Sequence, residues 1–293
     1  MRKDILLPGA ALAGGVLGFG LRRWQLASAY VPDTQLFIHR APATLALLAV
    51  MALLLVLTLA LVRGKGSGPR DFLPAFRCPS SGFMAVMATA GFLLLGAGGL
   101  GLLKGFDTLS LWRNYPGTVQ LALPLVMLLC GFLSLVSGLG LLMVGKSCYR
   151  DTLAPAACAL ASFPGLSAVA WMLVVHLSHG TDPVLMRYGF LLAASALLAL
   201  AHYDAVSFLF DRCRPRRLVL CSVMGTVLGI TALADRPALP HILLILGLSL
   251  SALALSAALL RNSFGPAWAS SFDRMPRGAE EEEDNSADID KEI

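Results

Sequence analysis

The chain has 293 residues, of which 57% are hydrophobic and only 14% are charged, and its formal net charge is +5. A soluble globular protein has about 45–50% apolar and about 25% charged residues, so the apolar excess indicates either one buried core or several membrane spans. The mean hydropathy is +0.73. Apolar runs of about 20 residues, the length that crosses a bilayer, recur along the whole chain and indicate several membrane spans.

The apolar runs predict eight membrane-spanning helices. Their expected ranges are 5–21, 42–62, 83–103, 119–145, 154–177, 188–210, 217–234 and 239–260. Helices are expected because a backbone in lipid must satisfy its own hydrogen bonds, and the short alternating segments of a membrane β-barrel are not visible. We therefore expect an all-α polytopic helix bundle over residues 1–262 and a tail over residues 263–293.

The positions of lysine and arginine predict the orientation of the bundle. With eight spans both termini share one side, and that side receives 16 of the 23 basic residues. Cytoplasmic loops carry the excess of Lys and Arg, so we expect both termini in the cytoplasm and a multi-pass protein of the cell membrane. The basic residues expected on the other side are Arg22, Arg23, Arg40, Lys104, Arg113, Arg187 and Arg236.

The first span has a second interpretation, as a cleaved signal peptide. Residues 27–29 read Ala-Ser-Ala, which resembles a cleavage site. Arg22 and Arg23 directly follow the apolar core, where signal peptides are usually uncharged, and this favours an uncleaved span. The remaining topology is the same in both cases.

The cysteines and the tail are informative about the expected cytoplasmic side. Five of the six cysteines fall on or near that side and one falls inside the fourth span, which suits free thiols and offers no disulfide framework. The tail from residue 280 to 293 holds eight acidic residues and one lysine, so we expect it to be disordered. It could fold back on the basic inner face, bind a partner, or only increase solubility.

Two glycine-rich stretches match nucleotide-binding patterns only formally. Residues 140–147 fit the phosphate-loop pattern and residues 96–101 fit the dinucleotide pattern, but both lie within spans and follow no strand. We expect Gly145 to cap the fourth span, and the glycines of 96–101 to permit close helix contact. Small residues four apart predict similar contacts at Ala10, Gly14 and Gly18, and at Cys221, Gly225 and Gly229.

The sixth span contains a candidate intramembrane polar site. Asp204 is the only carboxylate well inside a span, and its ionised form costs about 2.5–3.5 kcal/mol there unless it is paired. His202 lies about 200° away around the helix and faces another side. We expect Asp204 to meet Ser207 one turn on, or a cation from another helix, with Lys146 as the first candidate. The site is either protonatable or ligand-binding, or a structural contact between helices.

A second candidate site consists of four histidines near the outer ends of spans: His39, His176, His179 and His241. His176 and His179 are three residues apart and share a face if the helix persists. If the helix ends converge, the four imidazoles could bind a transition metal or haem iron. The alternative is that they are interfacial or loop residues that never meet.

A basic cluster lies between the sixth and seventh spans. It contains Arg212, Arg214, Arg216 and Arg217, which we expect to mark the cytoplasmic side and to contact anionic lipid headgroups. The cluster is too short and too close to the membrane to indicate nucleic-acid binding.

The sequence leaves three functions open. Intramembrane carboxylate chains and the HExxH and GxSxG motifs are missing, so no catalytic residue is predicted. The first interpretation is a non-catalytic membrane subunit or accessory protein, without a cofactor, whose partner is another membrane protein or a second copy. The second is a transporter or permease for a small, weakly hydrated or amphipathic solute, with Asp204 and His202 at the site. The third is the membrane anchor subunit of a quinone- or haem-linked oxidoreductase that uses the outer histidines. The chain resembles the quinol-oxidising anchor subunits of some respiratory complexes in span number alone.

Overall fold

The computed structural model describes residues 3–31, 33–34, 36–63, 68–115, 117–179 and 187–265. The acidic tail that the sequence predicts to be disordered lies outside these residues. The elements in chain order are α1 (Lys3–Ser28), β1 (Tyr30–Val31), β2 (Leu36–Phe37), α2 (Pro42–Val62), α3 (Phe72–Phe76), α4 (Ser81–Asn114), α5 (Ala122–Arg150), α6 (Pro155–Leu160), α7 (Phe163–Ser178), α8 (Gly189–Ser207), the 3-10 helix η2 (Phe208–Phe210), α9 (Pro215–Ala232), the 3-10 helix η3 (Leu233–Asp235) and α10 (Leu239–Phe264). The two short strands pair antiparallel, with Tyr30 opposite Phe37.

Within the described ranges, eight helical segments are long and apolar enough to cross a membrane, which confirms the predicted all-α bundle. The fifth crossing combines α6 and α7, the sixth continues from α8 into η2, and the seventh continues from α9 into η3. Every predicted span overlaps one of these segments. The protein is therefore an integral membrane protein with eight apolar helical segments.

Several helices continue past the predicted ends of their spans, namely α1, α4, α5 and α10, and α4 continues the furthest. Helix α4 continues to Asn114, beyond the predicted end at residue 103, because charged and polar residues from Lys104 on interrupt the apolar run without ending the helix. Helix α5 runs through Gly145 to Arg150, so Gly145 is not a cap. Gly145 faces α4, since a Cβ at this position would lie 2.8 Å from the Cβ of Met87. The helix ends instead at Asp151, which adopts a left-handed conformation with φ of 57°.

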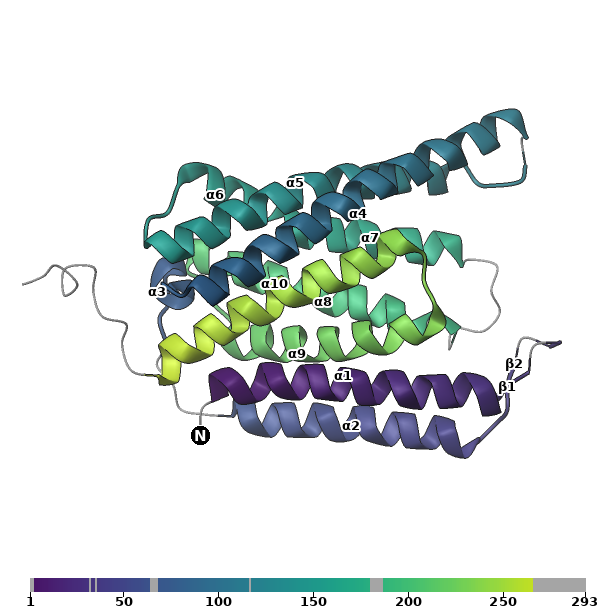
Figure 1. Cartoon of the computed structure of the whole chain (residues 1–293), viewed down its shortest axis with the longest axis horizontal. Coiled ribbons are helices and arrows are strands. Elements are labelled where there is room, and N and C mark those ends of the chain that lie inside the picture. The colour runs from purple at the N-terminus through teal and green to yellow at the C-terminus, as the bar shows by residue number, and fades with distance from the viewer. Residues whose placement is uncertain are drawn as a thin grey trace, which may run out of the picture.

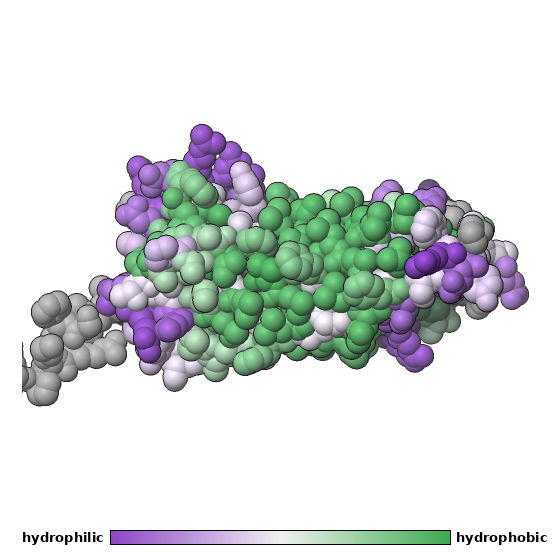
Figure 2. Space-filling model, turned by 90° about the horizontal axis from the view of Figure 1, so that it is seen from above, coloured by the Kyte–Doolittle hydropathy of each residue, from purple (hydrophilic) through white to green (hydrophobic). Residues whose placement is uncertain are grey.

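The helices lie roughly along one axis, and the molecule has two distinct ends (Figure 1). We call the end where α1 begins and α10 finishes the terminal end, and the end that carries β1 and β2 the strand end. The visible face is a continuous apolar band between two hydrophilic ends, as expected for a protein surrounded by lipid (Figure 2).

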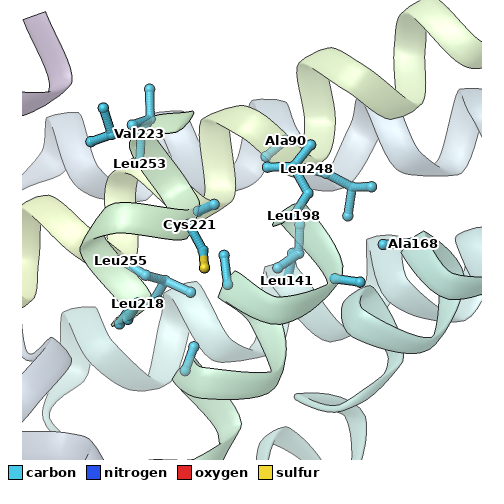
Figure 3. Close-up of a cluster of buried hydrophobic side chains, with 14 of the residues drawn as sticks. Ala90, Leu141, Ala168, Leu198, Leu218, Cys221, Val223, Leu248, Leu253 and Leu255 are labelled. Carbon is cyan, nitrogen blue, oxygen red and sulfur yellow. The ribbon is translucent and has the colours of Figure 1, made fainter. Parts of the chain in front are cut away.

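Helices α9 and α10 form the centre of the bundle and α2 its periphery. Among the spanning segments, α9 and α10 have the largest buried shares, and α2 has the smallest. Helix α10 packs against α4, α9 and α1, while α8 packs against α9 and α7. Small and medium side chains fill the space between these helices, including Ala90 of α4, Leu198 of α8 and Leu248 of α10 (Figure 3).

Glycines spaced seven apart hold α4 and α5 together, and this pair has the most extensive contact in the described structure. A Cβ on Gly98 would lie 2.7 Å from the carbonyl oxygen of Gly131, and one on Gly91 would lie 2.9 Å from that of Gly138. Seven-residue spacing keeps the glycines on the seam of two helices that wrap around each other. The contact predicted within residues 96–101 is thus confirmed at Gly98.

The small residues predicted on two other helices also make close contacts. On α1, a Cβ at Gly14 would meet Leu54 of α2, and one at Gly18 would meet Thr231 of α9. On α9, Gly225 faces Leu198 and Gly229 faces Ile245. These glycines let α1, α8 and α10 pack closely around α9.

Candidate functional site

The candidate polar site is built around an ion pair between α8 and α9. The side chain of Asp204 is fully buried in the last turns of α8. Arg217, in the first turn of α9, donates from Nε to Oδ2 of Asp204 at 2.7 Å and from its terminal NH2 group to Oδ1. This two-pronged geometry matches the planar guanidinium to the carboxylate. The Arg217 side chain is 34% exposed, and its guanidinium lies 5.9 Å from the centre of the Tyr203 ring.

The tight connection between the two helices explains this pairing. After η2 the chain turns at Asp211, which has φ of 55°, and α9 then begins with Pro215 at its first position. Helices α8 and α9 are thereby antiparallel neighbours, so the start of one lies beside the end of the other. The buried carboxylate thus meets a cation only 13 residues away in the chain.

Two details of the predicted site were wrong. Lys146 is not the partner of Asp204, because it lies exposed on α5, while the most extensive neighbour of α8 is α9. Ser207 does approach Asp204, but its hydroxyl donates to the backbone carbonyl of Asp204 at 2.7 Å rather than to the carboxylate. The carboxylate is therefore held by Arg217, a residue that the sequence assigned to lipid contact.

His202 faces a different helix, as its position two residues before Asp204 predicts. Its Nδ1 lies 2.9 Å from the carbonyl oxygen of Leu198, which can only accept, so Nδ1 carries a proton. Nε2 lies 3.0 Å from the hydroxyl oxygen of Ser251 on α10. His202 is buried and joins α8 to α10, whereas Asp204 joins α8 to α9.

The four histidines near the strand end do not form a cluster. His39 and His176 are exposed, and His179 stacks on Tyr188 at 5.0 Å between ring centres. His241 accepts a hydrogen bond from the indole Nε1 of Trp171 at 3.1 Å. Within the described ranges, no three His, Cys, Asp or Glu side chains gather as metal ligands. The histidines therefore do not converge on one site, and His179 and His241 each contact a different aromatic residue.

A second charged network, which the sequence analysis missed, lies at the strand end. Arg22 of α1 is fully buried, and its Nε donates to Oδ1 of Asp235 in η3 at 2.9 Å. Its NH1 donates to Oε1 of Gln25 at 2.7 Å, and Gln25 donates to the hydroxyl of Thr44 on α2 at 2.8 Å. The guanidinium also lies 5.0 Å from the ring centre of Phe190 on α8. One arginine therefore connects α1 to η3, α2 and α8.

The sequence contained a signal for this network. Arg22 follows Gly18 by four residues and Gly14 by eight, so it continues the small-residue face of α1. Its position beside Arg23, at the end of an apolar run, instead favoured a flanking charge in water. Arg23 is indeed exposed.

The basic cluster after α8 is divided between two environments. Arg212, Arg214 and Arg216 are exposed, while Arg217 is engaged by Asp204. The three exposed arginines lie near the terminal end, at the edge of the apolar segment. Contact of these three arginines with anionic lipid headgroups stays a prediction.

All six cysteines are free thiols, as the sequence predicts. Cys78, between α3 and α4, lies outside the spans, and its backbone N–H donates to the carbonyl of Cys148 at 3.0 Å. Burial raises the pKa of the Cys78 thiol, while a hydrogen bond from the Ser80 backbone and the charge of Arg261 act in the opposite direction. A thiol of this kind is a poor nucleophile at neutral pH.

In comparisons with known protein families, with curated proteins and with solved structures, no match to the chain was found. The function is therefore inferred from the geometry alone. Both buried charges and the buried histidine are bonded to other groups of the chain. This arrangement fastens helices to one another, and it offers no activated nucleophile or proton relay among the residues described here.

Proposed function

We propose that this integral membrane protein is a non-catalytic subunit or accessory protein of a larger membrane assembly. The observation that supports this is how three of the buried ionisable side chains in the described residues are used. Arg22, Asp204 and His202 each bond to side chains on neighbouring helices. A transport site or proton relay needs groups that exchange partners or protons during its cycle. Here each group instead joins two or more helices into a fixed frame.

The α4–α5 hairpin offers this frame a surface for a partner. Helix α4 has 34 residues, which corresponds to about 51 Å of rise, against about 30 Å of bilayer hydrocarbon. The hairpin extends past the neighbouring helices at the strand end (Figure 1). Its distal part exposes Phe106, Leu111 and Tyr115 among polar residues. A partner protein that covers this part would remove these apolar side chains from water.

The test is native mass spectrometry of the protein purified gently from its own membrane. The proposal expects a second protein at fixed stoichiometry. A lone chain or a homo-oligomer that carries only lipid would contradict it and would favour the transporter, for which loss of uptake in Asp204→Asn at unchanged abundance is the next measurement. A bound haem or quinone would favour the oxidoreductase anchor instead.

We further propose that the terminal end faces the cytoplasm of a cell-membrane protein and that the exposed arginines there contact anionic headgroups. The support is the excess of basic residues on that side. Fusion of a fluorescent protein or of alkaline phosphatase to the C-terminus tests the orientation. Fluorescence without phosphatase activity is expected, and active phosphatase would contradict the proposed orientation. Replacing Arg212 and Arg214 with glutamine is expected to weaken retention of anionic lipid during purification.

A further inference from the structure

A cavity of about 90 Å³ lies near the strand end, between α4, α5, α7 and α10. Its inner wall is buried and mostly apolar, with Ala97, Leu244 and the hydroxyl-bearing Ser134. Its outer wall includes Lys104 and Ser178, which are exposed. The cavity thus changes from a charged mouth to an apolar interior over about two turns of helix.

His241 lines this cavity in a fixed orientation. The indole of Trp171 donates to Nδ1 of His241 at 3.1 Å, and the two rings are nearly parallel, with an angle of 27° between them. An indole can only donate, so Nδ1 must hold a lone pair, and the neutral ring then carries its proton on Nε2. Within the described structure, the Nε2 atom has no hydrogen-bond partner. It is an N–H donor on a ring that a fully buried tryptophan holds in place.

Lys104 supplies positive charge to the same cavity. No carboxylate of the described residues lies within ion-pair distance of its ammonium group. The hydroxyl of Ser134 is already used, since it donates to the carbonyl of Cys130 at 2.7 Å. The Lys104 ammonium and Nε2–H of His241 are both donors on residues that line the cavity, and one of them is a cation. Such a site selects a ligand with an anionic, hydrogen-bond-accepting group.

We propose that this cavity binds a short-chain monocarboxylate. The carboxylate accepts from the Lys104 ammonium and from Nε2–H of His241, and the short apolar body packs against Ala97 and Leu244. The volume sets the size limit, because drug-sized ligands occupy pockets of about 300–1,000 Å³. The site differs from the helix-joining contacts of Asp204 and Arg22, and it goes beyond the proposed role as a membrane subunit.

The experiment uses butyrate as the probe and Trp171 as the reporter. Replacing Trp24, Trp112 and Trp268 with phenylalanine leaves Trp171 as the only tryptophan. Butyrate is expected to change its emission saturably, whereas sodium chloride at equal ionic strength is not. Butyramide, which lacks the charge, is expected to bind about tenfold more weakly. Absence of a saturable change with butyrate, or equal binding of butyramide, would overturn the proposal.

Variants locate the site and test its size. Lys104→Gln is expected to weaken butyrate binding about tenfold through loss of the charged donor. Arg113→Gln, an exposed cation on the same helix outside the cavity, is the matched control and is expected to leave binding unchanged. Equal affinities of Lys104→Gln and the parent protein would refute the site. Decanoate is expected to bind no better than butyrate, and tighter binding of decanoate would show a membrane-derived fatty acid and overturn the size limit.

Discussion

The ion pair between Asp204 and Arg217 is expected to respond asymmetrically to the loss of its two members. Arg217→Met keeps an apolar stem over Tyr203 but leaves the Asp204 carboxylate without its cation. Asp204 is fully buried, so the charge cannot reach water. Asp204→Asn has the opposite consequence, because Arg217 is 34% exposed and its long side chain can extend to the interface.

The expected magnitudes follow from this difference in burial. Removing the partner of a buried charge costs about 3–5 kcal/mol, and we expect Arg217→Met to fall in this range. Asp204→Asn should cost about 1–2 kcal/mol, since it weakens two hydrogen bonds to a charged group that can be solvated instead. The double variant Arg217→Met with Asp204→Asn should be more stable than Arg217→Met alone, because it no longer buries a charge.

Unfolding by sodium dodecyl sulfate in mixed micelles, followed by circular dichroism, measures these differences on purified protein. Lys146→Met is the matched control. Lys146 is exposed on α5, so its replacement is expected to leave the free energy of unfolding unchanged. Equal destabilisation by Arg217→Met and Asp204→Asn would refute the reasoning from burial. So would a double variant that is as unstable as the sum of the two single changes.

Three further predictions concern other parts of the molecule. Gly98→Ala is expected to lower the thermal midpoint in detergent, since overpacking costs about 1–3 kcal/mol. Gly99→Ala should not lower it, because a Cβ at Gly99 would meet nothing within 4 Å. Equal midpoints of the two variants would contradict the close α4–α5 contact. Arg22→Met should destabilise the protein by about 3–5 kcal/mol, because Arg22 is fully buried and ion-paired. Arg23→Met should cost less than about 0.5 kcal/mol, because Arg23 is exposed. The reverse order in the same micelle assay would show that the buried Arg22 network does not stabilise the fold. Alkylation of Cys78 by iodoacetamide, measured on its peptide by mass spectrometry, should be slow at pH 7 and should still accelerate above pH 9. The reason is that the pKa of this thiol is raised above its ordinary value of 9.0, which leaves little thiolate below that pH. A rate that reaches a plateau below pH 9 would contradict the effect of burial.

The sequence alone determined the membrane class and the eight apolar helical segments. Transfer of side chains into lipid is nearly a local property of each segment, so summed hydropathy locates the spans without knowledge of the packing. The helix ends differ from the predicted span ends where a helix continues beyond its apolar segment. The last turns of α4, from Lys104 to Asn114, stay helical although charged and polar residues interrupt the apolar run, so hydropathy alone did not locate the helix end.

The tertiary structure decided how the polar residues are used. The cost of a carboxylate in lipid identified Asp204 from the sequence, but its partner depends on which cation the packing brings within reach. The turn between α8 and α9 selects Arg217 over Lys146. Arg22 looked like a charge in water at the end of a span, and only the meeting of α1 with η3 shows that it is buried against Asp235. The position of a charged residue in its own helix determines the free-energy cost of placing it in lipid. The neighbouring helices determine which partner group offsets that cost.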